Sequence, residues 1–393
     1  MMEPFRIAVS EAEVEDLRGR VRAARWPDQI PGSGWTYGTD LETLRSFADH
    51  WADGYDWRRH EAELNQFPQF VTPIQGQKVH FLHVRSPEPD AMPLVLTHGW
   101  PGSISEFARV IGPLVDPVAH GGRAEDAFHV VVPSLPGYGF SGPTSEPGWD
   151  VRRTAGAWAE LMSRLGYERY GAQGGDWGSM VSRHLADVDA DHVIGVHVNM
   201  AMGFPPGEPD DMEDMTEREA DGLARMQEYM GTGSGYVAIQ STQPQTLAYG
   251  LTDSPVGLLG WILEKFRAWT DNDGDVLQAV SLDELLTNVS IYWFTGTAGS
   301  SARMYYESIS SGAVLVPPSG RVPLGVANFP QEIITARRRW IERDSNLVHW
   351  TEFDEGGHFA ALEQPELLVR DIRTFFGPLR GRSAGEPHPV SHR

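Results

Sequence analysis

The spacing of apolar side chains changes along the chain and indicates where helices give way to strands. Apolar residues recur at helical spacing over 11–24, 40–51 and 57–65, and the period then shortens to the alternation of strands over 70–72 and 79–84. We therefore expect an N-terminal helical segment that leads into paired strands.

Short apolar runs then alternate with helical stretches. The apolar run 93–98 predicts a strand, 128–132 predicts a buried strand, and 170–173 predicts a strand that ends just before a turn at position 176. A capping box predicts a helix from Ser103, and apolar periodicity predicts another over 158–165. Alternation of this kind is typical of a mostly parallel sheet with helices on both faces.

Strand patterns are missing from 205–312, where helical patterns replace them. The later expected elements are helices over 217–229, over 255–269 and from Ser281, strands over 322–326 and 347–350, and a closing helix over 363–376. We therefore expect a helical lid that is inserted into the sheet.

Composition restricts the partners of the chain. Its 393 residues carry 32 Lys and Arg against 54 Asp and Glu, and the net charge of −22 disfavours nucleic acid and anionic membranes. Cysteine is absent and the histidines are scattered without metal-ligand spacing, so we expect no metal site.

The chain has no sequence signal for secretion or membrane insertion. The N-terminus is acidic rather than basic and apolar, and the apolar segment 256–263 is far shorter than the roughly 20 residues of a spanning helix. We expect a soluble, cytoplasmic protein without a membrane anchor, and a homodimer is a candidate assembly.

Asp176 is the most informative residue in the sequence. The stretch 173–179 has the Gly-x-nucleophile-x-Gly spacing of the strand-to-helix turn in α/β-hydrolases, with aspartate at the position usual for serine. An aspartate with a pKa near ~4 is an anion at neutral pH and needs no base to attack. Attack on a saturated carbon would give an ester that water can cleave, so epoxides and alkyl halides are the expected electrophiles. A simple acidic helix cap is the alternative interpretation.

Two backbone amides are candidates for an oxyanion hole. The amide of Trp177 follows the nucleophile at a helix N-terminus, and the amide of Trp100 lies in the segment 98–103 after an earlier strand. Haloalkane dehalogenases usually carry a halide-binding asparagine where this chain has Trp100, which disfavours halide chemistry.

The catalytic base should follow the last strand, and its orienting acid should follow the strand before. His358, in a glycine-rich loop, is the candidate base. Glu332 is the preferred acid, and Asp354 and Asp344 are its rivals.

Epoxide opening also requires a proton, which a neutral phenol can supply. The lid region offers several tyrosines, and spacing alone does not choose among Tyr229, Tyr236, Tyr249, Tyr292, Tyr305 and Tyr306.

Several motifs, in this order along the chain, resemble the microsomal-type epoxide hydrolases, which include juvenile-hormone epoxide hydrolases and soluble bacterial relatives. They are Ala-Arg-Trp-Pro-Asp at 24–28, Phe-Pro-Gln-Phe at 67–70, 98–103, 174–179, Asp-Ser-Pro-Val-Gly at 253–257, Ile-Tyr-Trp at 291–293 and Gly-Gly-His-Phe-Ala at 356–360. The resemblance implies an α/β-hydrolase fold with a helical lid and an N-terminal segment that wraps around core and lid. It also implies an Asp176, His358 and Glu332 triad, and it places the two lid tyrosines of the family at Tyr236 and Tyr305, next to Tyr306.

The expected divisions of the chain follow from the patterns and the resemblance together. They are an N-terminal epoxide-hydrolase segment (1–85), a first core part (86–204), the lid (205–312), a second core part (313–379) and a disordered tail (380–393).

The functional prediction is hydrolysis of an apolar or aromatic epoxide to a vicinal diol through an aspartyl ester, in detoxification or natural-product biosynthesis. This hydrolysis needs no cofactor. A dehalogenase-like hydrolase is the nearest alternative, and a catalytically inactive hydrolase fold that only binds ligands is the other.

Overall fold

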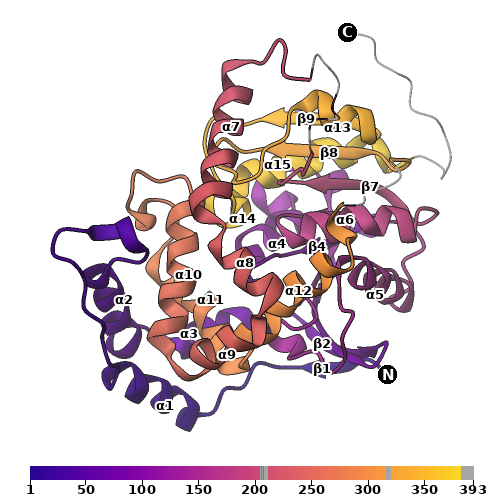
Figure 1. Cartoon of the computed structure of the whole chain (residues 1–393). Helices are drawn as coiled ribbons and strands as arrows, with labels where there is room; N and C mark the ends of the chain where they lie inside the picture. Colours follow the sequence, from indigo (N-terminus) through magenta and orange to yellow (C-terminus); the bar gives the residue numbers. More distant parts are fainter. Residues whose placement is uncertain (204, 206, 208–210, 316–319, 382–393) are drawn as a thin grey trace.

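A computed structural model of the chain describes residues 1–203, 205, 207, 211–315 and 320–381, and the predicted disordered tail lies outside the described residues from position 382 onward (Figure 1). Its centre is a nine-stranded sheet with the strand order β1-β2-β3-β5-β4-β6-β7-β8-β9. The strands are β1 (Glu3–Phe5), β2 (Gln69–Ile74), β3 (Gln77–Val84), β4 (Met92–Thr97), β5 (Phe128–Pro133), β6 (Tyr170–Gly174), β7 (Val193–Val198), β8 (Leu324–Asn328) and β9 (Leu347–Glu352).

The sheet is antiparallel at one edge and parallel elsewhere. Strands β1, β2, β3 and β5 pair antiparallel in succession, whereas all pairs from β5 and β4 through to β9 are parallel. Most residues of β4, β5 and β6 are fully buried, as expected for strands covered on both faces. The predicted mostly parallel α/β fold is confirmed.

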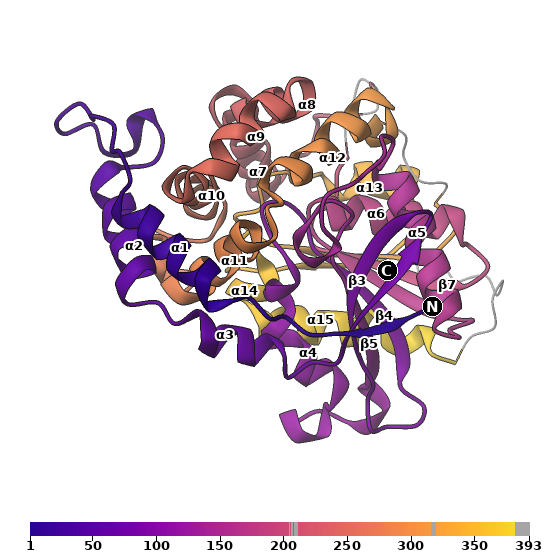
Figure 2. The same cartoon turned by 90° about the horizontal axis from the view of Figure 1, so that it is seen from below.

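Helices cover both faces of the sheet (Figure 2). On one side α4 packs against α15, and α15 contacts β7 and β8; on the other side α5 packs against α6, which contacts β4, β6 and β7. The helices of the core are α4 (Ala108–Val115), α5 (Val151–Arg164), α6 (Trp177–Val188), α13 (Arg338–Asp344), α14 (Ala360–Glu363) and α15 (Pro365–Phe376).

The helices between β7 and β8 form a separate group, which we call the lid. They are α7 (Glu217–Glu228), α8 (Gly235–Thr242), α9 (Pro244–Asp253), α10 (Pro255–Trp269), α11 (Leu282–Thr295) and α12 (Ala298–Ser310). The N-terminal helices α1 (Glu11–Arg22), α2 (Leu41–Asp53) and α3 (Trp57–Leu64) lie along the outer side of this group (Figures 1 and 2). There α1 and α2 contact α10, and α3 contacts α11.

Two helix starts differ from the sequence prediction. Helix α5 begins at Val151, seven residues before the predicted start, because the Asp150 side chain accepts a hydrogen bond from the Arg153 amide and caps it there. The α-helix expected from Ser103 begins only at Ala108. Ser103 instead caps a short 3₁₀ turn, and its hydroxyl accepts a hydrogen bond from the Ser105 amide.

Asp176, the candidate nucleophile, follows β6 at the switch point of the sheet, where successive strands are added on opposite sides of β4. Strand β4 lies between β5 and β6, and its last residue, Thr97, is paired with Gly174 at the end of β6. The loops that follow these two strands therefore leave the same edge of the sheet side by side. In open α/β sheets this switch point, beyond the carboxyl ends of the strands, is where ligands bind.

Candidate active site

Asp176 occupies a strained turn between β6 and α6. Its backbone has φ 49° and ψ −127°, and a positive φ is unfavourable for a residue that carries a Cβ. Close packing maintains the turn, because a Cβ at position 178 would lie 1.9 Å from the Thr97 carbonyl oxygen and one at position 99 would lie 2.2 Å from Asp176 Oδ1. Glycine at both positions lets the loop after β4 approach the carboxylate.

The amide of Trp100 contacts the carboxylate of Asp176 directly. It donates a hydrogen bond of 2.7 Å to Oδ1. Helix α11 of the lid fixes this loop, since Asn288 Nδ2 donates to the Pro101 carbonyl at 2.6 Å and the Tyr292 hydroxyl donates to the Gly102 carbonyl at 2.8 Å. The second predicted oxyanion donor, Trp177, is the first residue of α6, where amides lack partners within the helix.

His358 lies between Asp176 and Glu332. Its Nδ1 is 2.7 Å from Glu332 Oε1, and its Nε2 is 3.5 Å from Asp176 Oδ2. Glu332 Oε1 also accepts a hydrogen bond of 2.7 Å from the Ile333 amide, and the side chain is 1% exposed. The three candidate residues thus form one chain of contacts, in which a carboxylate fixes the orientation and tautomer of the imidazole.

Charge and burial oppose each other at His358. Burial alone would lower the pKa of the imidazole, but the negative charges of Glu332 and Asp176 and their hydrogen bonds raise the pKa well above its usual value. We therefore expect a protonated imidazole beside the free carboxylate at neutral pH.

The C-terminal end of α10 holds the loop that carries His358. The His358 amide donates to the Trp269 carbonyl at 2.9 Å, and the Gly356 amide donates to Asp271 Oδ2 at 2.7 Å. Glu363 accepts hydrogen bonds from the amides of both Asp271 and Phe359. The lid thereby contributes directly to the position of the imidazole.

Tyr236 in α8 and Tyr305 in α12 are both buried next to the nucleophile turn. Their ring centroids are 5.7 Å apart, and the Tyr236 ring stacks on the indole of Trp100 at 4.9 Å. Tyr305 contacts the indole of Trp177 edge to face at 4.6 Å. Burial raises the pKa of both phenols well above 10, and the Asp176 charge acts in the same direction. Both phenols are therefore neutral at pH 7 and keep the proton of the hydroxyl group.

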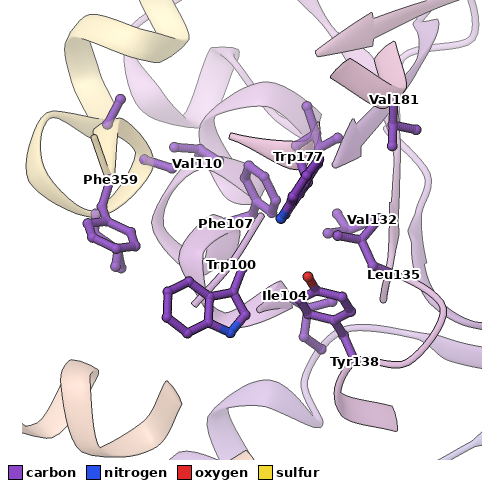
Figure 3. Close-up of a cluster of buried hydrophobic side chains, with 14 of the residues drawn as sticks. Trp100, Ile104, Phe107, Val110, Val132, Leu135, Tyr138, Trp177, Val181 and Phe359 are labelled. Atoms are coloured by element: carbon purple, nitrogen blue, oxygen red, sulfur yellow. The ribbon is translucent and has the colours of Figure 1, made fainter. Parts of the chain in front are cut away.

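Hydrophobic side chains surround the two segments that carry Trp100 and Trp177. Trp100 and Trp177 belong to a buried cluster that also contains Tyr138, Ile104 and Phe359 (Figure 3). In such an apolar setting, hydrogen bonds to a developing charge are stronger than in water.

The remaining tyrosines named from the sequence occupy other environments. Tyr306, the neighbour of Tyr305, is 44% exposed, and Tyr249 is 71% exposed. Tyr292 donates to the loop of Trp100 as described above. The rival acids are also elsewhere: Asp344 is exposed, and the exposed Asp354 lies 3.4 Å from Arg218 rather than beside the imidazole.

Two further residues lie close to Tyr236: Tyr229, one of the six tyrosines that the sequence offered, and Lys265, which was not singled out from the sequence. The hydroxyl of Tyr229 lies 2.7 Å from the hydroxyl of Tyr236, and the ammonium of Lys265 lies 4.6 Å from the centre of its ring. A signal for Lys265 does exist, because positions 262, 265, 266 and 269 share one face of α10 and the other three are buried and apolar. Lysine is almost never fully buried unless it is paired, so a lysine on a buried helix face is unusual.

Within the residues that the structure describes, no group of three or more side chains is arranged to ligate a metal ion. Over the same residues, no helix combines the length and the apolar character needed to cross a membrane.

Comparison with known proteins agrees with this architecture. Residues 2–107 match the family "Epoxide hydrolase N terminus", and residues 92–232 match the family "alpha/beta hydrolase fold". Epoxide hydrolase 1 of Sus scrofa is 38% identical over 404 residues, covering 96% of this chain and 89% of that protein.

Two solved structures are similar over nearly the whole chain. The juvenile hormone epoxide hydrolase of the silkworm Bombyx mori superposes with a TM-score of 0.89 at 32% identity, covering 97% of this chain and 95% of that one. The Aspergillus niger epoxide hydrolase gives a TM-score of 0.87 at 34% identity, covering 96% and 97%. These similarities favour epoxide chemistry over the dehalogenase and binding-protein alternatives. The chain belongs to the epoxide hydrolase family of the α/β-hydrolase fold.

Proposed function

We propose that this epoxide hydrolase converts an apolar or aromatic epoxide to a vicinal diol through a covalent ester on Asp176. The observation that carries the proposal is the position of Asp176, with the His358 and Glu332 pair in contact with its carboxylate and two buried phenols against the loops that flank it. A carboxylate nucleophile, a base and a proton donor are the groups that ester formation and ester hydrolysis require.

The contacts of the carboxylate suggest which oxygen attacks. Because Oδ1 accepts the hydrogen bond from the Trp100 amide, Oδ2 is the oxygen that attacks the epoxide carbon. As the ring carbon–oxygen bond breaks, the oxirane oxygen takes a proton from a lid tyrosine. Oδ1 becomes the carbonyl oxygen of the ester and remains close to the donor that stabilises the later oxyanion.

Ester formation also prepares His358 for the second step. The ester is neutral, so one of the two charges that raise the pKa of the imidazole disappears when it forms. The imidazole then loses its proton more readily and acts as base toward water, while Glu332 fixes its orientation. Water attacks Cγ of Asp176 and gives one proton to His358. The imidazole passes this proton to Oδ2 as the bond between Cγ and Oδ2 breaks, and the diol leaves with Oδ2.

The tyrosine pair gives a test of the epoxide-specific part of the proposal. Changing Tyr305→Phe is expected to reduce diol formation from a styrene-type epoxide by about 10²-fold, because one of two donors to the oxirane oxygen is lost. Tyr306→Phe is the matched control and is expected to leave the rate unchanged, since that side chain is 44% exposed. Chiral chromatography of the diol gives both rates.

Equal rates for Tyr305→Phe and the wild type would contradict a role of Tyr305 in ring opening. Release of halide from alkyl halides without any diol from epoxides would favour the dehalogenase alternative. A cytoplasmic location, a homodimer and the lack of nucleic-acid partners stay predictions from the sequence.

A further inference from the structure

The two lid tyrosines beside Asp176 have unequal surroundings. The Tyr236 hydroxyl has a second phenol, Tyr229, at hydrogen-bond distance. The Tyr305 hydroxyl is buried and has no hydrogen-bond partner among the described residues. The pair is therefore asymmetric, although both phenols lie against the same indole, that of Trp100.

Tyr229 reaches Tyr236 from an irregular part of the lid. It is the first residue of a π-helical turn, Tyr229–Gly233, which joins the end of α7 to the start of α8. Such turns are rare and frequently lie at functional sites. The Tyr229 ring also contacts Trp269, whose indole lies 5.0 Å from the imidazole of His358. The Tyr229 ring and the imidazole of His358 therefore contact the same indole, that of Trp269.

A positive charge adds to the asymmetry. Lys265 is 3% exposed, and its ammonium lies 4.6 Å from the ring centre of Tyr236. The nearby carboxylate of Glu264, at 2.8 Å, pairs with the ammonium. The stacked indole of Trp100 already covers one face of the phenol, so the ammonium lies over the other face.

These contacts bear on which phenol gives its proton more readily. A hydrogen bond donated to a phenol oxygen stabilises the phenolate that remains after proton transfer, and so does a nearby positive charge. If the Tyr229 hydroxyl donates to the Tyr236 oxygen, the proton of Tyr236 is free to point at the oxirane oxygen. Tyr305 has no comparable donor among the described residues.

We propose that Tyr229 is a positioning residue that makes Tyr236 the proton donor to the opening epoxide, while Tyr305 holds the oxirane oxygen by a hydrogen bond. This division of roles rests on the proposed function. In the first step the O–H bond of Tyr236 breaks as the new hydroxyl of the ester forms, and the hydrogen bond from Tyr229 stabilises the phenolate. In the second step His358 takes one proton from the attacking water and passes it to Oδ2, which leaves as the second hydroxyl of the diol. The other proton of that water leaves the Asp176 carboxyl group and replaces, through solvent, the proton that Tyr236 gave.

The test uses the variant Tyr229→Phe, which removes one hydroxyl and keeps the ring. Single-turnover experiments with a styrene-type epoxide separate the rate constant of ester formation from that of ester hydrolysis. We expect Tyr229→Phe to lower the rate of ester formation about tenfold and to leave ester hydrolysis unchanged. Tyr249→Phe, at an exposed tyrosine of α9, is the matched control and should leave both rates unchanged.

A double-mutant cycle distinguishes this role from simple packing. If Tyr229 acts through Tyr236, adding Tyr229→Phe to Tyr236→Phe has no further effect on ester formation, whereas adding it to Tyr305→Phe keeps the tenfold loss. Unchanged ester formation in Tyr229→Phe overturns the inference. Equal slowing of both steps, or an undiminished loss on the Tyr236→Phe background, overturns it as well. Failure of the wild-type chain to form any diol would instead reject the proposed function.

Discussion

Replacing Asp176 by alanine is expected to reduce diol formation by at least about 10⁴-fold, because the nucleophile is lost and the remaining groups can only polarise the substrate. Alanine keeps a Cβ at the strained position, so the turn itself has no additional group to accommodate. The rate of diol formation is measured at saturating epoxide, and circular dichroism checks that the variant is folded.

Asp354→Ala is the matched control for this experiment. Asp354 was a rival acid in the sequence, and its side chain is fully exposed, so its removal should leave the rate unchanged. Retention of even a tenth of the wild-type rate in Asp176→Ala would mean that water attacks the epoxide directly. If the wild type bound epoxides without converting them, the result would favour the alternative of a catalytically inactive hydrolase fold that only binds ligands.

Replacing His358 by glutamine is expected to stop the reaction after ester formation. The attack by Asp176 needs no base, whereas hydrolysis of the ester does, so the second step should slow by about 10³-fold. One equivalent of epoxide should react, and intact-protein mass spectrometry should find the enzyme heavier by the mass of one substrate molecule. Peptide mapping should then place the adduct on Asp176.

Two further variants serve as an intermediate case and as a control for this experiment. Glu332→Gln should also accumulate the ester but hydrolyse it faster than His358→Gln does. The variant keeps the imidazole and loses only the carboxylate that orients it and stabilises its positive charge. His192→Gln, at a half-exposed histidine, should behave as the wild type. Absence of any adduct in His358→Gln, together with loss of substrate consumption, would contradict the separation of the two steps.

The sequence predicted the sheet where single segments carried strong patterns. Strands 93–98 and 128–132 are almost fully buried, and their short runs of apolar residues identify them without tertiary information. Strand 170–173 has no such run, and its place directly before the turn at Asp176 indicates it. Strand β1, only three residues long, has no periodic pattern because it is an edge strand formed by pairing with β2. Strand β7 was missed because Gly195 and His197 interrupt its apolar run. The side chain of His197 is accommodated in the core by Asp371, at 2.9 Å.

The sequence predicted those residues of the candidate site that belong to a motif with a fixed geometry. It did not predict the contacts that arise only when helices of the lid pack together. The spacing around Asp176 and the chain order of Glu332 and His358 named residues that the fold brings into contact. The Tyr229 and Tyr236 contact depends on the π-helical turn between two helices, which no local pattern indicates. The hydrogen bonds between the end of α10 and the His358 loop join residues that are about 90 positions apart in the sequence. They become visible only in the folded chain.

Formation of an ester on Asp176 can be tested by following the water oxygen through a single turnover. With enzyme in excess over epoxide in ¹⁸O-labelled water, we expect an unlabelled diol and one labelled oxygen in the Asp176 carboxylate, because water attacks Cγ and the diol leaves with Oδ2. Label in the diol of the first turnover, with an unlabelled Asp176, would contradict the covalent mechanism.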